Sequence, residues 1–162
     1  MDELSDIANK IYKMSSRLTD GLADGVNKTA GRVRDNAKGR LGDYQDGWKP
    51  LKDATVARKL NKNKKASKKH EQKHGGLVAA GTSADAPLID SGQMRAKTTA
   101  EMNRGNLSAK IGTSVIQAAT HEYGDEERGI PERPYLRPAL KEEVSKHFIK
   151  DLREGVRSSM RI

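Results

Sequence analysis

The sequence predicts an α+β protein, in which a small antiparallel sheet is packed by helices, with a long amphipathic helix at the N-terminus and another helix at the C-terminus. Apolar residues recur every three or four positions from Leu4 to Leu41 and again from Leu140 to Val156, which is the period of a helix with one buried face. Between these stretches, residues 107–113 alternate apolar and polar side chains, as a half-buried strand does. Helices at both ends with strand between them indicate the mixed class.

Residues 1–45 are the predicted N-terminal helical segment. Its apolar positions are Leu4, Ile7, Ile11, Met14, Leu18, Leu22, Val26, Ala30, Val33, Ala37 and Leu41. Gly21 and Gly25 each weaken a helix by about 1 kcal/mol relative to alanine, so we expect a bend or break there. An unbroken helix of this length would reach roughly 57 Å. Because a small domain cannot cover that length, part of the stripe should pack against another chain or fold back.

Residues 46–162 are the predicted α+β domain. Trp48 offers the largest apolar surface in the chain and is expected to anchor the core. The spacing first predicts a short helix from Asp53 or Ala54 to about Leu60, a short strand over 77–80, and a helix over 92–103 with Met94 and Met102 facing inward. It then predicts a strand over 107–113, a helix over 115–123 that closes at Gly124, an extended edge segment over 130–135, and a last helix that opens at Arg137 or Pro138.

The composition limits what kind of protein this can be. Only 34% of the residues are apolar and the net charge is +9, so the core should be small. The absence of cysteine excludes disulfides and thiolate metal sites. No run approaches the roughly 18 apolar residues of a membrane span, and the acidic start is unlike a signal peptide. We therefore expect synthesis in the cytoplasm and no membrane partner.

The positive charge is concentrated in a predicted basic loop over residues 58–76. Its basic residues are Arg58, Lys59, Lys62, Lys64, Lys65, Lys68, Lys69 and Lys73, against the single acid Glu71. Since the run has no apolar face, we expect a loop or a frayed extension of the preceding helix. It contains no aromatic side chains on which bases could stack, so contact with DNA would be non-specific attraction to phosphate. Plain solvation and contact with an acidic neighbouring subunit are the other interpretations.

A zinc-peptidase pattern, His70-Glu71-Gln72-Lys73-His74, lies inside the basic run. In this pattern two histidines one helical turn apart hold zinc, and the glutamate is the general base. Glu101 or His121 would have to supply a third ligand, and nothing in their spacing singles them out. Lysines precede the motif and Gly75-Gly76 follows it, so the apolar wall of a catalytic site is missing. We interpret the pattern as a chance match and expect no metal, no cofactor and no catalytic residues.

A proline-rich segment near the C-terminus is the predicted interface. Proline fixes its own backbone and removes a hydrogen-bond donor, so the three prolines exclude a central strand and leave a rigid, extended segment. A segment that is already ordered loses little entropy on docking. The predicted interface residues are Pro131, Arg133, Pro134, Tyr135, Arg137 and Pro138.

Three stretches of the sequence carry a resemblance when they are taken together. They are Trp48-Lys49-Pro50-Leu51 with Thr55 and Arg58-Lys59 following, Pro87-Leu88-Ile89-Asp90-Ser91-Gly92-Gln93-Met94-Arg95, and His121-Glu122-Tyr123-Gly124 with Ile130 to Leu140. In this order they resemble a family of tailed-bacteriophage virion-morphogenesis proteins. The match covers roughly residues 48–140, and the order and spacing of the stretches carry it. Met94 stands where the family usually has leucine, Tyr135 where phenylalanine is commoner, and the basic run is an insert.

The resemblance implies a structural protein, not an enzyme. It would complete the tail or join head to tail, as a homo-oligomeric ring of six copies in the neck of the virion, after synthesis in the host cytoplasm. Its partners would be other neck and tail proteins, such as the tail terminator, the tail tube or the head-closure protein. Two other functions stay open on the residues alone: a basic DNA-binding accessory protein, and a zinc hydrolase that uses His70, Glu71 and His74.

Overall fold

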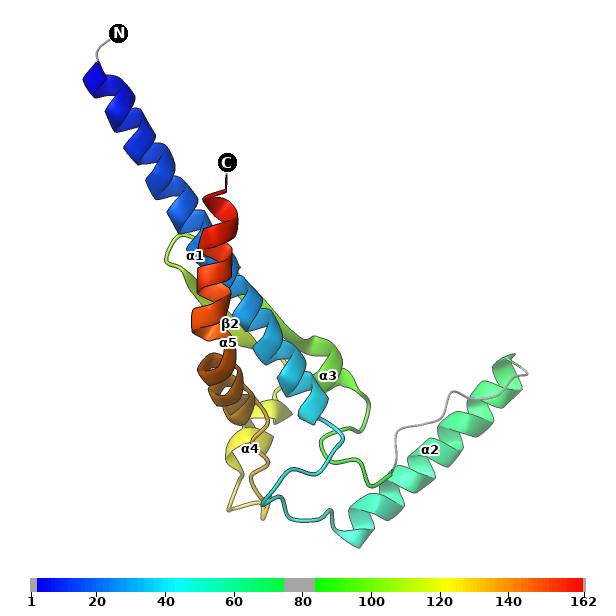
Figure 1. The fold of residues 1–162 in the computed structure, drawn as a ribbon. Coiled ribbons are helices and arrows are strands. Elements are labelled where there is room, and N and C mark those ends of the chain that lie inside the picture. Colours follow the sequence, from blue (N-terminus) through cyan, green and yellow to red (C-terminus); the bar gives the residue numbers. More distant parts are fainter. Residues whose placement is uncertain (1–2, 75–83, 162) are drawn as a thin grey trace. The chain divides into compact units, whose positions relative to one another are not determined.

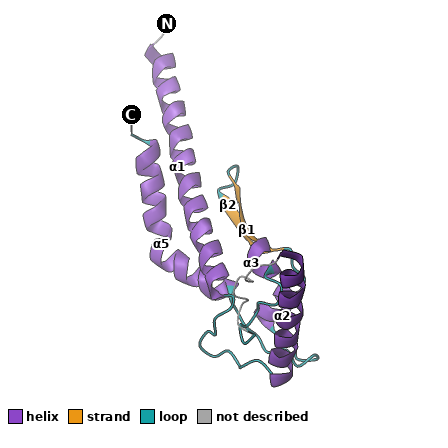
Figure 2. Cartoon of the chain, turned by 90° about the vertical axis from the view of Figure 1, so that its right-hand side faces the viewer, coloured by secondary structure: helices purple, strands orange, loops and turns teal. Residues whose placement is uncertain are grey.

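The computed structural model describes residues 3–74 and 84–161, and it confirms the predicted mixed fold class (Figure 1). Its two strands form an antiparallel sheet in which Thr98 pairs with Thr113 and Asn103 pairs with Ser108 (Figure 2). None of the described helices is long and apolar enough to cross a membrane. The elements are α1 (Glu3–Arg40), α2 (Asp53–His74), α3 (Gln93–Lys97), β1 (Thr98–Asn103), β2 (Ser108–Thr113), α4 (Gln117–Tyr123) and α5 (Leu136–Ser159).

Contacts divide the chain into two units, each built from separate stretches of sequence. The first unit takes residues 1–37, 98–113 and 136–162, which hold most of α1, the β1–β2 hairpin and α5. The second unit takes residues 38–97 and 114–135, which hold α2, α3 and α4. The predicted segments 1–45 and 46–162 divide the sequence once, whereas the first unit draws on both of them.

In the first unit α1 and α5 lie side by side, and glycines allow the two backbones to approach (Figures 1 and 2). A Cβ atom on Gly25 would lie 2.6 Å from the Cα of Leu152, and one on Gly21 would lie 2.7 Å from the Cα of Val156. The predicted bend at these glycines is wrong, because α1 is one helix over Glu3–Arg40. Here the missing side chains make room for α5, and its packing offsets their weak helix propensity.

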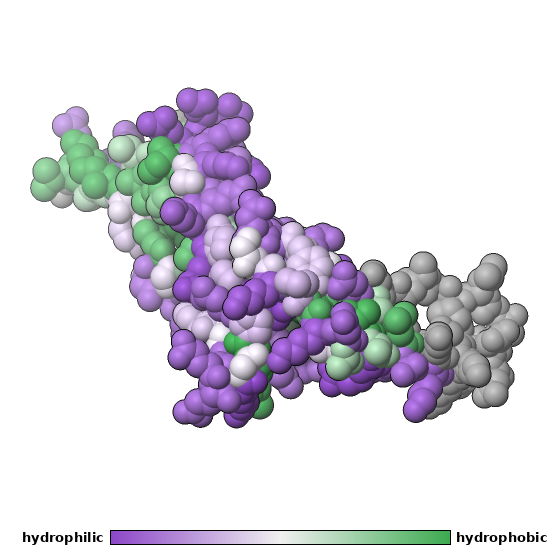
Figure 3. All heavy atoms as spheres, turned by 90° about the horizontal axis from the view of Figure 1, so that it is seen from below, coloured by the Kyte–Doolittle hydropathy of each residue, from purple (hydrophilic) through white to green (hydrophobic). Residues whose placement is uncertain are grey.

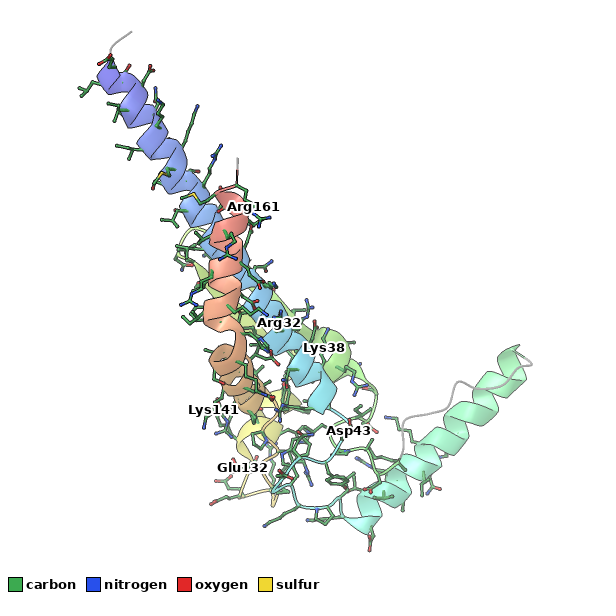
Figure 4. The ribbon with its side chains drawn as sticks, in the orientation of Figure 1. Arg32, Lys38, Asp43, Glu132, Lys141 and Arg161 are labelled. Atoms are coloured by element: carbon green, nitrogen blue, oxygen red, sulfur yellow. The ribbon has the colours of Figure 1, made fainter. Side chains whose placement is uncertain are left out.

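A buried carboxylate reinforces the contact between α1 and α5. Asp151 has no exposed surface, and its Oδ2 accepts hydrogen bonds from Thr29 Oγ1 at 3.1 Å and from Arg32 Nε at 3.0 Å. Lys28 Nζ lies 3.4 Å from Oδ1 of the same carboxylate. These donors all come from α1, and Arg32 projects from it in Figure 4. A fully desolvated charge is tolerated here because several donors surround it.

Within the first unit, the β1–β2 hairpin contacts α1 through its turn. Oδ1 of Asn103 accepts hydrogen bonds from the backbone N–H groups of Gly105 at 3.0 Å and Asn106 at 3.4 Å, which closes the turn. Arg104 at the tip forms an ion pair with Asp24 of α1 at 2.6 Å. The strand predicted over 107–113 is therefore confirmed as β2, and its partner strand precedes it directly.

The helix predicted over residues 92–103 is wrong beyond Lys97. Only Gln93–Lys97 is helical, and the chain then continues as β1. Thr98 and Thr99 are β-branched, a type that favours strands, and Thr98 is fully buried. The two methionines that were expected to face inward on one helix belong to two different elements, since Met94 is in α3 and Met102 in β1.

Residues 58–74 of the predicted basic loop are helical. They extend the preceding helix, which was the second of the two predicted alternatives, and do not form a loop. Helix α2 begins at Asp53 as predicted, but it ends at His74 and not near Leu60. Lysine, alanine, glutamate and glutamine are good helix formers, which offsets the lack of an apolar face. The strand predicted over 77–80 lies outside the described residues.

The core of the second unit forms around Trp48. The tryptophan is buried, as predicted, and other fully or nearly buried side chains of this unit include Leu41, Ile89, Met94 and Tyr135. The backbone N–H of Gly42 donates to the carbonyl of Pro87 at 3.0 Å, which links the two loops that carry these residues. This core holds the segments that form the candidate site.

Candidate functional site

The candidate site lies in the second unit, where one arginine ties two distant segments together. The backbone N–H of Arg133 donates to the carbonyl of His121 at 2.7 Å. Its guanidinium Nη2 donates to the carbonyl of Lys49 at 2.9 Å, and the carbonyl of Pro50 lies at 3.5 Å. Arg133 is only 6% exposed. The proline segment is therefore fixed to α4 by the backbone of Arg133, and to the residues that follow Trp48 by the Arg133 side chain.

A tight turn returns the chain from α4 to the proline segment. Asp125 and Ile130 exchange two backbone hydrogen bonds of 2.8 Å. Gly124, just before this turn, has φ +75°, and a Cβ there would lie 3.0 Å from the backbone nitrogen of Glu132. Glycine is required at this position both by its backbone angle and by the close approach. Sequence reasoning identified Gly124 as the end of this helix, which the structure confirms.

A buried acid at the end of α4 fixes the end of the proline segment. Oε2 of Glu122 accepts a hydrogen bond from the backbone N–H of Tyr135 at 2.9 Å, and both residues are buried. Burial, with a smaller effect from the charge of Glu122, raises the pKa of Tyr135 to about 12. Sequence reasoning did not assign this role to Glu122, because its partner is a backbone N–H group and no pattern of side chains indicates one.

The predicted interface residues divide into two groups. Arg133 and Tyr135 were expected to contact another subunit, but their side chains are buried within the protomer's own fold, because they are needed for its core and for its internal hydrogen bonds. Pro131, Pro134 and Pro138 are half-buried and Arg137 is exposed. Whether the segment contacts another chain stays a prediction.

A cavity of about 380 Å³ opens between the segments that Arg133 ties together. Lys59 on its wall is buried and donates a hydrogen bond from Nζ to the carbonyl of Ala86. Burial lowers the pKa of Lys59, against the opposing charges of Asp90 and Asp85. Asp90 is ion-paired with Lys62 at 2.7 Å. The lining residues include Leu51, Thr55, Arg58, Leu88, Ile89, Asp90, Met94, His121 and Arg133.

This cavity offers binding surface but no catalytic arrangement among the described residues that line it. His121 contributes an imidazole to this lining, and its Nδ1 is buried without a hydrogen-bond partner. Among the described residues no group of three histidines or acids could hold a metal ion. The side chains of His70, Glu71 and His74 lie outside those described, so the zinc pattern stays untested.

Protonation of His121 should destabilise the protein. Burial lowers the pKa of His121 from its ordinary value of 6.5, and the nearby charge of Arg133 lowers it further. Between the lowered folded value and 6.5 the unfolded chain binds more protons, so stability should rise with pH through this window and level off above it. Urea unfolding of the wild type and of His121→Gln between pH 5 and pH 8 measures this. The free energy of unfolding of the variant should change much less with pH than that of the wild type. An equal pH dependence in both proteins would mean that groups other than His121 cause it.

Removing the Arg133 side chain should also destabilise the protein. Arg133→Ala deletes the hydrogen bond to the carbonyl of Lys49 and empties a buried position, so we expect a loss of about 2 kcal/mol in the free energy of unfolding. Chemical denaturation measures it. Arg128→Ala is the control, because Arg128 is exposed and pairs with Asp125 of its own turn, so that variant should change stability by less than about 0.5 kcal/mol. Equal losses of stability in the two variants would mean that the Arg133 side chain does not hold the two segments together.

The basic side chains of α2 differ in their surroundings. Lys59 and Lys62 are engaged by Ala86 and Asp90, whereas Arg58 and Lys65 are exposed. The side chains of Lys64, Lys68, Lys69 and Lys73 lie outside those described. One face of the second unit thus carries exposed cations on a regular helix.

Comparison with known proteins finds a relative in an archaeon. A protein of Methanocaldococcus jannaschii, described as uncharacterized, is 28% identical over 94 residues, which are 58% of this chain and 57% of that protein. The chain thus matches a little over half the length of this relative. No family model matches the sequence, and no solved structure matches it significantly.

Proposed function

We propose that this protein is a non-enzymatic virion component of a tailed bacteriophage, which completes the tail or joins head to tail as a ring in the neck. The observation that carries the proposal is the packing of the three resembling stretches around one cavity of the second unit. Residues 48–51, 87–95 and 121–135 are far apart in sequence, yet Arg133 binds the first stretch and all three line the cavity. Motifs matched by chance have no reason to lie together.

Ring formation would use opposite charges on the second unit. The turn after α4 carries exposed acids at Glu126 and Glu127 besides the exposed Arg128, and the proline segment that follows it carries Glu132, which is labelled in Figure 4. Helix α2 carries exposed cations at Arg58 and Lys65, of which Arg58 lines a pocket with Glu126 of its own copy and Lys65 does not. A head-to-tail ring brings two different faces of identical subunits together, so an acidic turn can meet the basic helix of the next copy. The rigid proline backbone keeps the entropic cost of ordering the turn low.

The partners of such a ring are other phage proteins of the neck and tail, such as the tail terminator, the tail tube or the head-closure protein. The protein would be made in the host cytoplasm and end in the virion. An interface that rests on surface charge should be weak for isolated chains and stable in the assembled particle, where many copies act together.

Electron microscopy of lysates from a phage or prophage lacking this gene tests the proposal. Separate heads and tails should accumulate, and the full chain supplied in trans should restore joined particles. Supplying the double variant Arg58→Glu and Lys65→Glu should fail to restore them, whereas Lys110→Glu, on an exposed strand position, should succeed. Normal particles without the protein would overturn the proposal.

A second candidate, a DNA-binding accessory protein, is favoured by the helical form of the basic run. A regular helix with exposed cations can follow a phosphate backbone. This function predicts duplex binding whose affinity falls steeply with salt, by a log–log slope of about −0.9 for each phosphate contacted. Filter binding at several salt concentrations measures the slope, and deletion of 61–74 should abolish the binding.

A further inference from the structure

The N-terminal part of α1 carries an apolar stripe that α5 does not cover. Helix α5 ends at Ser159, whose side chain lies beside Gly21, so the turns of α1 before Gly21 extend past it. On this arm, residues 3–18, the stripe residues are 79% exposed at Leu4, 64% at Ile11 and 41% at Leu18, and Ile7 and Met14 are exposed as well. Figure 3 shows apolar side chains gathered at this end of α1, at the left of the view.

The spacing of the stripe is that of a two-helix contact. Positions 4, 7, 11, 14 and 18 alternate steps of three and four, so they form a single narrow seam along the helix, as in coiled coils. A helix that lies on a membrane has a wider apolar face and a polar face rich in cations. The polar face of the arm mixes acids with cations. A second helix of similar width therefore fits this surface better than a lipid surface does.

Charge along the arm identifies a partner of the same kind. The first turn holds the acids Glu3 and Asp6, and the following turns hold Lys10, Lys13 and Arg17. A parallel copy would place acids beside acids and cations beside cations. An antiparallel copy instead places the acidic end of each arm beside the basic end of the other, although Lys10 of the two copies meet at the centre. The ends of the arm are therefore complementary to each other when one copy is reversed.

We propose that the arms of two copies pair as an antiparallel two-helix coiled coil. Layers form between Leu4 and Met14 of the other copy and between Ile7 and Ile11 of the other copy. In this register Glu3 lies beside Arg17 of the other copy at both ends of the pair. The contact buries a seam that would otherwise leave apolar surface on the order of several hundred Å² in water. It uses the first unit and does not depend on the proposed ring, which uses charges of the second unit.

Sedimentation equilibrium of the full chain tests whether the arms pair. The wild type should form dimers, and Ile11→Asp should weaken the association at least tenfold, because it places a charge in the middle of the seam. Tyr12→Asp is the matched control, since Tyr12 is 76% exposed and projects from a different face. That variant should associate like the wild type. A wild-type monomer up to high concentration, or equal effects of both substitutions, would overturn the proposal.

Charge reversal tests the direction of the pair. Glu3→Lys alone and Arg17→Glu alone should each weaken the dimer several-fold, and the double variant should recover it, because each reversed charge again meets its opposite. Recovery is not expected for a parallel pair, in which the two positions of different copies are far apart. Loss of dimer in the double variant beyond that of the single variants would contradict the antiparallel register.

Cross-linking gives the register directly, because the chain contains no cysteine of its own. Ile7→Cys and Ile11→Cys proteins are mixed, oxidised and separated by mass after one is isotope-labelled. The antiparallel pair predicts the mixed disulfide as the main product. Disulfides mainly between identical variants would indicate a parallel pair, and flotation of the wild type with anionic vesicles in place of dimers would indicate a lipid surface; either result overturns the proposal.

Discussion

Gly25→Ala is expected to destabilise the protein by about 3 kcal/mol, although alanine is the better helix former. The new Cβ would lie 2.6 Å from the Cα of Leu152 and 2.8 Å from the carbonyl oxygen of Asp151. These are backbone atoms, which cannot rotate away as a flexible side chain can. Helix α5 would therefore have to move away from α1, and the hydrogen bonds around Asp151 would lengthen with it.

A glycine in the same helix provides the control for Gly25. A Cβ on Gly31 would meet nothing within 4 Å, so Gly31→Ala should stabilise the protein by up to about 1 kcal/mol through helix propensity alone. Urea unfolding followed by circular dichroism measures both variants. If the two substitutions changed the free energy of unfolding in the same direction, the close packing of α1 on α5 would be contradicted.

Asp151→Asn is expected to lower the free energy of unfolding by about 2 kcal/mol at neutral pH. Removing one charge of a buried ion pair is strongly destabilising, because the other charge is left without its partner. Here the partners Lys28 and Arg32 are partly exposed to solvent, which reduces the loss. Glu154→Gln is the control. Glu154 is an exposed ion-pair partner of Lys28, which also pairs with Asp151, so its loss should change the free energy of unfolding little. If both variants lost the same free energy of unfolding, the buried position of Asp151 would add nothing to the strength of its ion pairs.

The effect of Asp151 should disappear in acid. Burial would raise the pKa of Asp151, but the hydrogen bonds from Arg32 and Thr29 and the charge of Arg32 outweigh it, so the pKa lies below its ordinary 3.8. Because the folded value is the lower one, the stabilising contribution is complete above 3.8 and is lost as pH falls through the folded value. The difference between the wild type and Asp151→Asn should narrow steadily below pH 3.8 in urea unfolding experiments. A difference that stays constant with pH would rule out the carboxylate charge as its cause.

Periodicity predicted the elements whose packing is local and continuous. The apolar positions of α1, α5 and β2 follow a regular period, and all three elements were predicted from it. Gly21 and Gly25 were misinterpreted because helix propensity is a property of one segment, whereas their role is set by α5, more than a hundred residues later. Residues 98–103 were misassigned because the predicted helix was extended from its start near Asp90 to the stop at Gly105, whereas these residues pair with the strand that follows them.

The candidate site was predictable only in part. Pro131 and Pro134 indicated a rigid segment, and Gly124 indicated the turn before it, but the burial of Arg133 could not be predicted because its partner is the backbone carbonyl of Lys49. A carbonyl is present at every residue and leaves no signal in a sequence. Glu122 was similarly missed, because it binds a backbone N–H of Tyr135 and not another side chain.

The proposed function makes this protein a permanent part of a phage particle. Quantitative mass spectrometry of purified particles, from the phage or induced prophage that encodes the chain, tests it most directly. We expect about six copies per particle, the number in one closed ring of six subunits. Finished particles that lack the protein would overturn the proposed virion function and favour the DNA-binding alternative.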